Sequence, residues 1–248
     1  MKNQPHFSVK NLSFSFSRKE RPFFDSLEFT LSPASLTFVR GRNGIGKSLL
    51  LRILSGNVHA YERCTGTITL GGKEYELGGS QAFPQKYRDA VRMVHQKFDL
   101  MIADQFSFIE NIHLARLPKY PGLRMQAAPI TLPTTLNHFA IDLEKPVHLL
   151  SGGQRQILAT TMAIQKSTTV LLLDEPTAAL DYQNARTVMQ FLKELTQTAG
   201  LATIVISHDH ELVEQFAEDH YFELEVDENT ATRTLKKRAI TFHYHKEK

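Results

Sequence analysis

The chain has 248 residues, of which 42% are hydrophobic and 22% are charged, and its formal net charge at pH 7 is +3. This balance is typical of a globular protein, and the length allows one large domain or one domain with an inserted subdomain. No stretch approaches the ~20 consecutive apolar residues of a membrane-spanning helix, and the N-terminal segment lacks the apolar run of a secretory signal. The single cysteine, Cys64, excludes an internal disulfide framework. We therefore expect a cytoplasmic protein, and the small net charge gives no argument for nucleic-acid binding.

Short stretches in the first hundred residues are apolar or alternate apolar and polar side chains, which is the pattern of strands. A glycine-rich turn separates these strands from a stretch with helical spacing, which Ser55 and Gly56 end. A stretch rich in Gly and Thr then predicts a small hairpin. The expected strands cover 7–9, 12–16, 27–31, 36–39 and 91–95, the helix covers 48–54, and the hairpin covers 66–79.

Between 97 and 149 the chain changes character, because helical spacing appears and four prolines between 118 and 133 interrupt it. We expect an inserted, mostly helical subdomain here. From Gly152 onward, apolar strands alternate with amphipathic helices, which predicts a mainly parallel sheet covered on both faces, and therefore an α/β fold. The expected elements are helices at 106–117, 132–139 and 183–198 and strands at 169–173 and 203–206.

The turn between the strand at 36–39 and the helix at 48–54 carries the pattern G-x-x-x-x-G-K-S, from Gly41 to Ser48. Its glycines let the backbone bend around a phosphate chain with successive N–H groups pointing inward, and the helix start adds its positive dipole end. Lys47 would reach the outer phosphates, and the Ser48 hydroxyl would bind Mg²⁺. A chance glycine-rich loop would lack the flanking strand and helix. The sequence therefore predicts a nucleoside-triphosphate site.

An apolar strand near the middle of the second half ends in two carboxylates, Asp174 and Glu175. A parallel strand delivers its C-terminal residues to the crevice where ligands bind in such sheets. Asp174 would hold Mg²⁺, mostly through water, and Glu175 could polarise the attacking water. Four apolar residues followed by two acids are common on their own, so the prediction depends on the phosphate loop.

The segment 150–156, Leu-Ser-Gly-Gly-Gln-Arg-Gln, resembles the signature motif of ATP-binding cassette (ABC) proteins without a substitution. Further elements of that family follow in order along the chain. Gln96 is similar to the glutamine of the Q-loop, 179–181 resembles the D-loop, and 207–209 resembles the segment that contains the switch histidine, His208. The resemblance covers about residues 7–225.

The resemblance implies a P-loop NTPase (RecA-like) core with an ABC-type antiparallel β subdomain and an inserted helical subdomain. All of 1–248 would form one nucleotide-binding domain. Core and β subdomain would take up about 1–96 and 150–225, the helical subdomain about 97–149, and a C-terminal extension about 226–248. For that extension, which includes His243 and His245, we favour a plain edge strand over a metal-binding tip.

The resemblance also implies roles for single residues. Phe16 takes the place of the aromatic residue that stacks on adenine, although Phe14, Phe23 and Phe24 compete for this role. The implied catalytic residues are Lys47, Gln96, Glu175 and His208, and the implied Mg²⁺ ligands are Ser48, Gln96 and Asp174. The implied ATP contacts are Phe16, Gly41, Arg42, Asn43, Gly44, Ile45, Gly46, Lys47, Ser48 and Leu49. Leu49 stands where the family usually has threonine, which removes one hydroxyl.

In this family the signature contacts the nucleotide that is bound to the opposite subunit, so two cassettes face head to tail with ATP between them. The resemblance therefore implies a dimer, expected to be a homodimer. It also implies membrane permease subunits on other chains and a position on the cytoplasmic face of the membrane. An extracytoplasmic substrate-binding protein would be reached through the permease. The residues implied to act in trans are Ser151, Gly152, Gly153, Gln154 and Asp181.

We expect the chain to power an importer, because 142–148 lacks the Glu-Arg-Gly pattern of family exporters. The stretches 108–117 and 149–181 are most similar to cassettes of substrate-binding-protein-dependent uptake systems, with amino acids as one candidate cargo. The rival hypothesis is a soluble ABC ATPase that acts as a mechanical switch on nucleic acid, the ribosome or an assembly scaffold. A single cassette without long coiled coil favours transport, and intact Glu175 and His208 disfavour a cassette without turnover.

The stretch after Gln96 is expected to receive a helix of the membrane subunit. It carries apolar side chains, Phe98, Met101 and Ile102, that we expect to be exposed in a groove. The alternative is that these side chains belong to the core of the helical subdomain.

Overall fold

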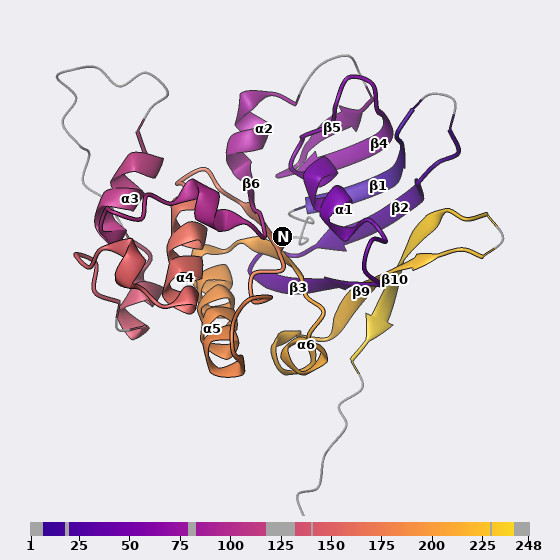
Figure 1. The fold of residues 1–248 in the computed structure, drawn as a ribbon. Helices are drawn as coiled ribbons and strands as arrows, with labels where there is room; N and C mark the ends of the chain where they lie inside the picture. The colour runs from indigo at the N-terminus through magenta and orange to yellow at the C-terminus, as the bar shows by residue number, and fades with distance from the viewer. Residues whose placement is uncertain are drawn as a thin grey trace, which may run out of the picture.

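The computed structural model describes residues 7–17, 20–78, 83–117, 132–139, 141–228 and 230–240. Its centre is a ten-stranded sheet in the order β5-β4-β1-β2-β10-β9-β3-β8-β7-β6 (Figure 1). The strands are β1 Phe7–Ser15, β2 Phe24–Leu31, β3 Ser35–Arg40, β4 Arg63–Leu70, β5 Lys73–Leu77, β6 Val91–Val94, β7 Val170–Asp174, β8 Ala202–Ile206, β9 His220–Val226 and β10 Arg233–Ala239. The helices are α1 Lys47–Leu54, α2 Gln85–Ala90, α3 Phe108–Ala115, α4 Gly152–Ala163, α5 Tyr182–Ala199 and α6 His210–Phe216, with 3₁₀ turns at Phe98–Met101, Thr134–His138 and Val147–Leu149.

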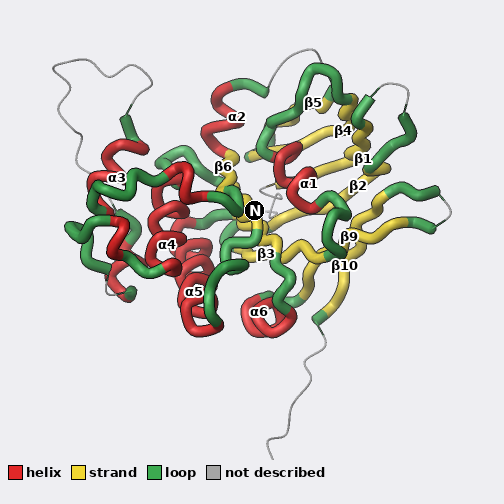
Figure 2. Tube along the Cα trace, viewed as in Figure 1, coloured by secondary structure: helices red, strands yellow, loops and turns green. Residues whose placement is uncertain are grey.

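The sheet combines a parallel part and an antiparallel part. Strands β3, β8, β7 and β6 pair in parallel, whereas β1, β2, β4 and β5 pair in antiparallel fashion. Helices α3, α4 and α5 gather at one end of the molecule and the antiparallel strands at the other (Figure 2). This arrangement confirms the α/β fold with a mainly parallel core. Among the helices that the structure describes, none is long and apolar enough to span a membrane.

Strand β7 shows why the parallel strands are apolar throughout. Val170 and Leu172 belong to the hydrophobic cluster that contains α1, and Leu171 and Leu173 belong to the cluster that contains α4 and α5. Because successive side chains of a strand point to opposite faces, a strand covered on both faces must be apolar at every position. Asp174, the last residue of β7, is therefore held at the end of a buried strand.

Helix starts near the site follow from local capping. Ser151 accepts a hydrogen bond from Gln154 N, at 3.2 Å, and the Gln154 side chain accepts one from Ser151 N, at 3.1 Å. This reciprocal capping box satisfies two backbone donors at the start of α4. The serine and glutamine of the signature therefore fix the point where α4 begins.

Several expected elements differ from the structure. The two strands expected at 7–9 and 12–16 form one strand, β1, with an irregular register around Asn11, whose φ is 51°. The helix expected at 132–139 is only the 3₁₀ turn Thr134–His138. Helix α2 was not expected, because its six residues are too few to show an apolar period; its buried Tyr87 donates a hydrogen bond to Leu54 O at 2.5 Å.

The C-terminal extension was expected to be a plain edge strand, and this is wrong for the described part. Strand β10 lies between β9 and β2 in the sheet. The physical reason is the antiparallel β9–β10 hairpin, which folds β10 back onto the start of β2. His243 and His245 lie outside the described residues, as do 118–131, which hold most of the proline-rich segment.

Candidate nucleotide-binding site

The predicted phosphate loop connects the end of β3 to the start of α1. Gly46 precedes α1 with a φ of 111°, a left-handed conformation that side chains with a β-carbon rarely adopt. Lys47 is the first residue of α1, and its Nζ donates to Gly41 O at 3.0 Å and to Arg42 O at 3.1 Å. Burial lowers the pKa of Lys47, and the nearby carboxylates of Glu175 and Asp174 act against this. The lysine cation is thus aimed into the concave side of the loop.

Asp174 lies beside the start of α1 and is buried. Burial raises the pKa of its carboxyl group, a hydrogen bond from the Ser48 hydroxyl opposes this rise, and the charge of Glu175 adds to it. The Oδ1 atom is buried without a hydrogen-bond partner among the described residues. A carboxylate with an unpartnered oxygen next to a hydroxyl fits the oxygen ligands that Mg²⁺ prefers. Ser48 and Asp174, which the sequence predicts as Mg²⁺ ligands, therefore lie next to each other in the structure.

Glu175 is held by two of the side chains that the sequence singled out. His208 Nε2 lies 2.8 Å from Glu175 Oε1, and Gln96 Nε2 donates to Glu175 Oε2 at 3.2 Å. Glu175 has a φ of 49°, and its backbone N–H donates to Ile206 O at 3.1 Å. The turn after β7 and the end of β8 thus hold this carboxylate between the histidine and the glutamine.

The four candidate aromatic residues form one cluster next to the phosphate loop. Phe14 and Phe24 are buried, whereas 42% of the Phe16 side chain is exposed. The Phe16 and Phe23 rings lie 5.1 Å apart at 76°. A base can stack only on an accessible ring face, so burial excludes Phe14 and Phe24 and leaves Phe16 and its neighbour Phe23 as candidates.

The signature, at the start of α4, lies apart from the phosphate loop at the start of α1 (Figure 1). No hydrogen bond or ion pair connects 151–154 to 41–48 in the part of the chain that the structure describes. A β-carbon on Gly152 would lie 2.8 Å from Leu180 Cδ2, so the signature packs directly against the D-loop. Asp181 caps α5 and accepts a hydrogen bond from Asn184 N at 3.0 Å.

A pocket of about 430 Å³ opens between the D-loop and the switch histidine. Glu175 and His208 contribute to its wall together with the start of α5. The catalytic candidates are therefore accessible from the side that carries the D-loop.

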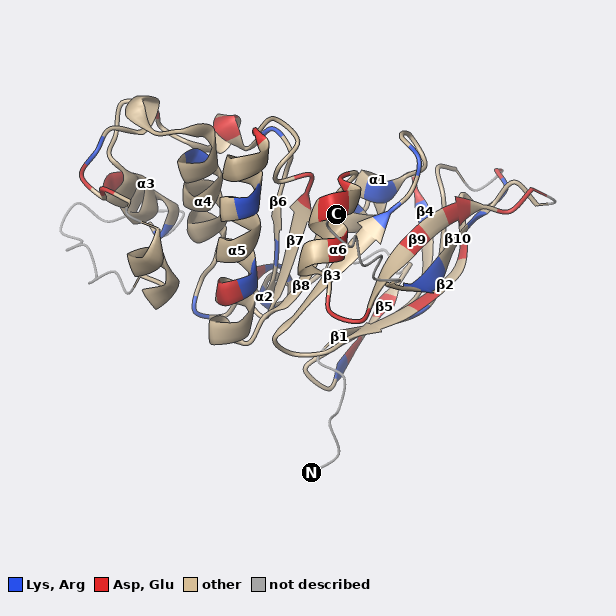
Figure 3. Cartoon of the chain, turned by 90° about the horizontal axis from the view of Figure 1, so that it is seen from below, with Lys and Arg blue, Asp and Glu red and all other residues tan. Residues whose placement is uncertain are grey.

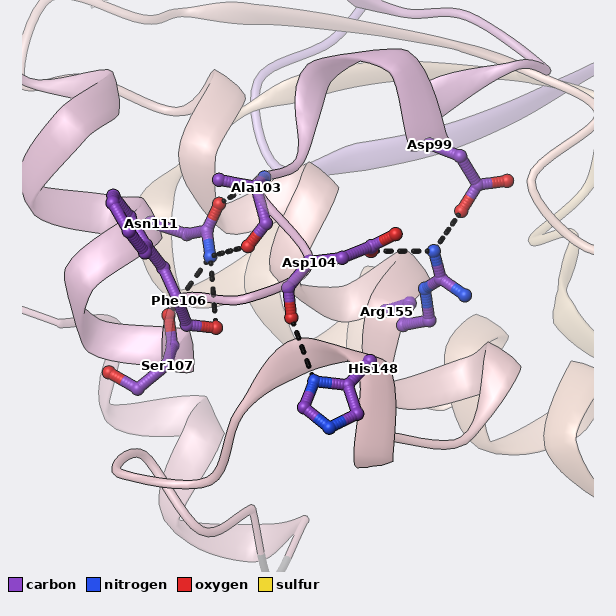
Figure 4. Close-up of polar contacts among 8 residues, drawn as sticks. All are labelled: Asp99, Ala103, Asp104, Phe106, Ser107, Asn111, His148 and Arg155. Carbon is purple, nitrogen blue, oxygen red and sulfur yellow. Dashed lines mark hydrogen bonds and ion pairs between the residues drawn. The ribbon is translucent and has the colours of Figure 1, made fainter.

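A polar cluster that the sequence did not indicate ties 98–107 to the signature helix (Figure 4). Arg155, in α4, lies 2.9 Å from Asp99 Oδ1 and 3.0 Å from Asp104 Oδ1. His148 Nδ1 lies 3.1 Å from Asp104 O. Asn111, in α3, holds the same loop at Ala103, accepting from its N–H at 2.8 Å and donating to its carbonyl at 3.0 Å. Of these residues, the sequence pointed only to Arg155, because it lies within the signature motif.

The apolar stretch after Gln96 was expected to expose Phe98, Met101 and Ile102. Met101 is exposed, but Ile102 is buried and Phe98 is partly buried against the helical core, so the expectation was wrong for these two. The 3₁₀ turn Phe98–Met101 points other residues outward, and Leu100 is 89% exposed. Strand or helix periodicity could not have shown this orientation, because the turn has neither period.

Known proteins are similar to this chain in sequence. A family model described as ABC transporter matches residues 24–178. An ABC transporter ATP-binding protein of Caldanaerobacter subterraneus is 30% identical over 215 residues, which cover 86% of this chain and 85% of that protein. The xylose import ATP-binding protein XylG of Brucella abortus is 34% identical over 172 residues, which cover 68% of this chain and 32% of that protein. The chain thus spans about a third of the length of that sugar-import protein.

Solved structures share the fold. CbiO1 of Clostridium perfringens, part of the ABC transporter complex CbiONQ, superimposes with a TM-score of 0.69 at 22% identity, covering 88% of this chain and 84% of that one. A dimeric ATP-binding cassette in a post-hydrolysis state with bound ADP and Pi gives a TM-score of 0.66 at 19% identity, covering 96% of this chain and 100% of that one. The family match extends over more than half of the chain. The chain therefore belongs to the ABC transporter family and is one of its ATP-hydrolysing cassettes.

Proposed function

We propose that this chain is the ATP-binding and ATP-hydrolysing subunit of an importer whose membrane-spanning permease subunits are other chains. The relative XylG is an import ATP-binding protein, which supports import, and CbiO1 is part of a transporter complex, which supports separate partners. The chain would act on the cytoplasmic face of the membrane. An extracytoplasmic substrate-binding protein would reach it only through the permease, so the cargo would be selected by other chains.

The observation that carries the proposal is the placement of Glu175. Its carboxylate is bound by His208 and Gln96, and its charge opposes the lowering of the Lys47 pKa that burial causes. Phosphoryl transfer to water needs a positioned nucleophile and neutralised charge more than covalent chemistry. In the proposed mechanism Lys47 binds the outer phosphates, and Glu175 orients the attacking water while His208 fixes that carboxylate.

The residues around Asp174 fit a magnesium ion. Ser48, Asp174 and Gln96 would hold it, and when bound it neutralises charge on the phosphates. Gln96 in addition donates to Glu175, so its amide can connect the metal ligands to the catalytic carboxylate.

The proposed active form is a homodimer. ATP bound at Lys47 of one copy would be contacted by Ser151, Gly153 and the D-loop of the second copy. The dimeric cassette of similar fold with ADP and Pi supports this arrangement. The dimer would close on ATP because ATP binds the closed dimer more tightly than the open one. Hydrolysis removes the ATP that favours the closed state, and the dimer would then open.

Exposed apolar residues on 98–107 would receive the permease. Leu100, Met101 and Phe106 are the exposed large apolar residues of this stretch. Through Arg155 and His148 the same stretch contacts the residues around the signature, so a movement of the permease would reach the second nucleotide.

Turnover by the purified chain tests the proposal. Glu175→Gln removes the charge that orients water, and we expect hydrolysis to fall at least a hundredfold while ATP still binds. Glu214→Gln, on the exposed side of α6, is the matched control and should keep the wild-type rate. Unchanged hydrolysis in the Glu175→Gln variant would remove Glu175 from this role.

A further inference from the structure

The β9–β10 hairpin places its second strand against the start of β2, about two hundred residues earlier in the sequence (Figure 1). Arg233, the first residue of β10, is in parallel register with Phe24. Its backbone N–H donates to Phe23 O at 2.9 Å. The backbone contact fixes where the Arg233 side chain leaves the sheet.

The turn that precedes Arg233 is held by its own hydrogen bonds. Asp227 N donates to Thr232 O at 2.8 Å, and Ala231 N donates to Asp227 O at 2.8 Å. The Arg233 guanidinium joins this turn, because Nη1 donates to Ala231 O at 3.0 Å. One end of the guanidinium is therefore anchored by the hairpin.

The Arg233 guanidinium stacks on an aromatic ring and has no carboxylate partner within the described ranges. Its Cζ lies 3.9 Å from the centroid of the Phe23 ring, and its Nε is buried without a hydrogen-bond partner there. Other cations of the same strand differ: Lys236 lies 2.8 Å from Glu225, and Arg238 contacts the same carboxylate. Charges of both signs along this hairpin are visible in Figure 3. Arg233 is thus held by stacking on the Phe23 ring, an interaction that the planar guanidinium favours.

Besides Arg233, Phe23 contacts residues of the candidate nucleotide site. A β-carbon on Gly46 would lie 2.6 Å from a carbon of the Phe23 ring, so this ring packs directly on the last glycine of the phosphate loop. The same ring lies 5.1 Å from Phe16, the accessible aromatic residue. Phe23 therefore connects Arg233 to both ends of the site, the phosphate loop and the base platform.

We propose that Arg233 is a positioning residue of the nucleotide site, which holds Phe23 as the wall between the Phe16 platform and the phosphate loop and so tightens binding of the nucleoside part of ATP. The proposal rests on the proposed function, because it takes these residues as the ATP site. Since the guanidinium acts through the ring, its removal should weaken contacts to base and sugar and leave the grip on the phosphates unchanged. It also gives the C-terminal hairpin a role in the site.

Calorimetric titration of the full chain with ATP and with inorganic tripolyphosphate tests this. Arg233→Met keeps the aliphatic stem but removes the cation, and we expect about threefold to tenfold weaker binding of ATP. Tripolyphosphate, which has no nucleoside, should bind as to the wild type. Arg233→Lys keeps the charge but not the planar stack, so its ATP affinity should lie between those of the wild type and Arg233→Met. If Arg233→Met lowers the melting temperature, Arg233→Lys alone is used for the test. Lys237→Ala, exposed on the same strand, is the control and should change neither affinity.

A double-mutant cycle separates action through Phe23 from a direct contact. In a Phe23→Leu background the Arg233→Met change should have no further effect on ATP affinity. The proposal is overturned by unchanged ATP affinity in Arg233→Met, by an equal loss for tripolyphosphate, or by an undiminished effect in the Phe23→Leu background. If the wild-type chain bound neither ligand, the proposed function would fail and this proposal with it, whereas a failure confined to the variants would overturn this proposal alone.

Discussion

At the scale of single residues, the two adjacent carboxylates of the site, Asp174 and Glu175, differ in burial and in hydrogen-bond partners. Asp174 is buried next to Glu175, and both its burial and that neighbour raise its pKa. Glu175 itself is half-buried and bonded to His208 and Gln96. In the proposed mechanism the two adjacent carboxylates have different roles, Asp174 as a metal ligand and Glu175 as the group that orients water.

The raised pKa of Asp174 predicts the pH dependence of magnesium-dependent ATP binding. Below that pKa the carboxyl group is protonated and cannot ligate a cation, so affinity should decrease as the pH falls through it. Glu175→Gln removes one of the causes of the rise, and the midpoint should move to lower pH. Titration of ATP affinity against pH in both proteins measures this, and a midpoint that stays in place would contradict the account.

Exposure separates the roles of the neighbouring phenylalanines. Phe16→Ala should weaken ATP binding about tenfold, because stacking of a base on an aromatic ring contributes about 1–3 kcal/mol, and it should leave stability nearly unchanged. Phe14→Ala, at a fully buried position, should instead cost about 3–5 kcal/mol of unfolding free energy. Calorimetry and urea unfolding of both variants check this. The reverse pattern would show that Phe16 belongs to the core.

At the scale of elements, 98–107 is held by Asn111 of α3 and by Arg155 of the signature helix α4, through bonds of different strength (Figure 4). Asn111 is 1% exposed and makes three hydrogen bonds of 3.0 Å or less, to Ala103 N, Ala103 O and Ser107 O. The carboxylates of Asp99 and Asp104, which pair with Arg155, are 61% and 52% exposed. The buried amide should therefore hold the loop, and the ion pairs should mainly orient it.

This difference predicts unequal stabilities. Asn111→Ala leaves buried backbone groups without partners and should cost about 2 kcal/mol or more. Arg155→Ala breaks solvent-exposed ion pairs and should cost less than about 1 kcal/mol. Urea unfolding at equal ionic strength compares them; a larger loss for Arg155→Ala would contradict this assignment.

The sequence predicted those elements whose pattern is local. Strands β3, β7 and β8, the phosphate loop and α5 could be found because apolar runs, glycines and caps lie next to each other in the chain. The contact of Phe23 with Gly46 and the stack of Arg233 on Phe23 could not be found, since they depend on how the hairpin folds back onto β2. The exposure of Leu100 and the burial of Ile102 follow from a 3₁₀ turn that has no apolar period.

At the scale of the whole molecule, the phosphate loop and the signature are separate within one chain. The loop lies at the start of α1, and the signature lies at the start of α4, packed on the D-loop. If both grip one triphosphate, they must belong to different copies. ATP-dependent pairing is therefore the central claim of the account.

The most direct test is the mass in solution of the Glu175→Gln protein with ATP, with and without Ser151→Asp. Aspartate keeps the helix cap that Ser151 provides and adds a negative charge that would repel the partner's triphosphate. By light scattering after gel filtration, we expect Glu175→Gln to be a dimer with ATP, and Glu175→Gln with Ser151→Asp to stay monomeric while it still binds ATP at the phosphate loop, more weakly because the contacts from the second copy are lost. A dimer that persists in the double variant would contradict the shared grip on ATP.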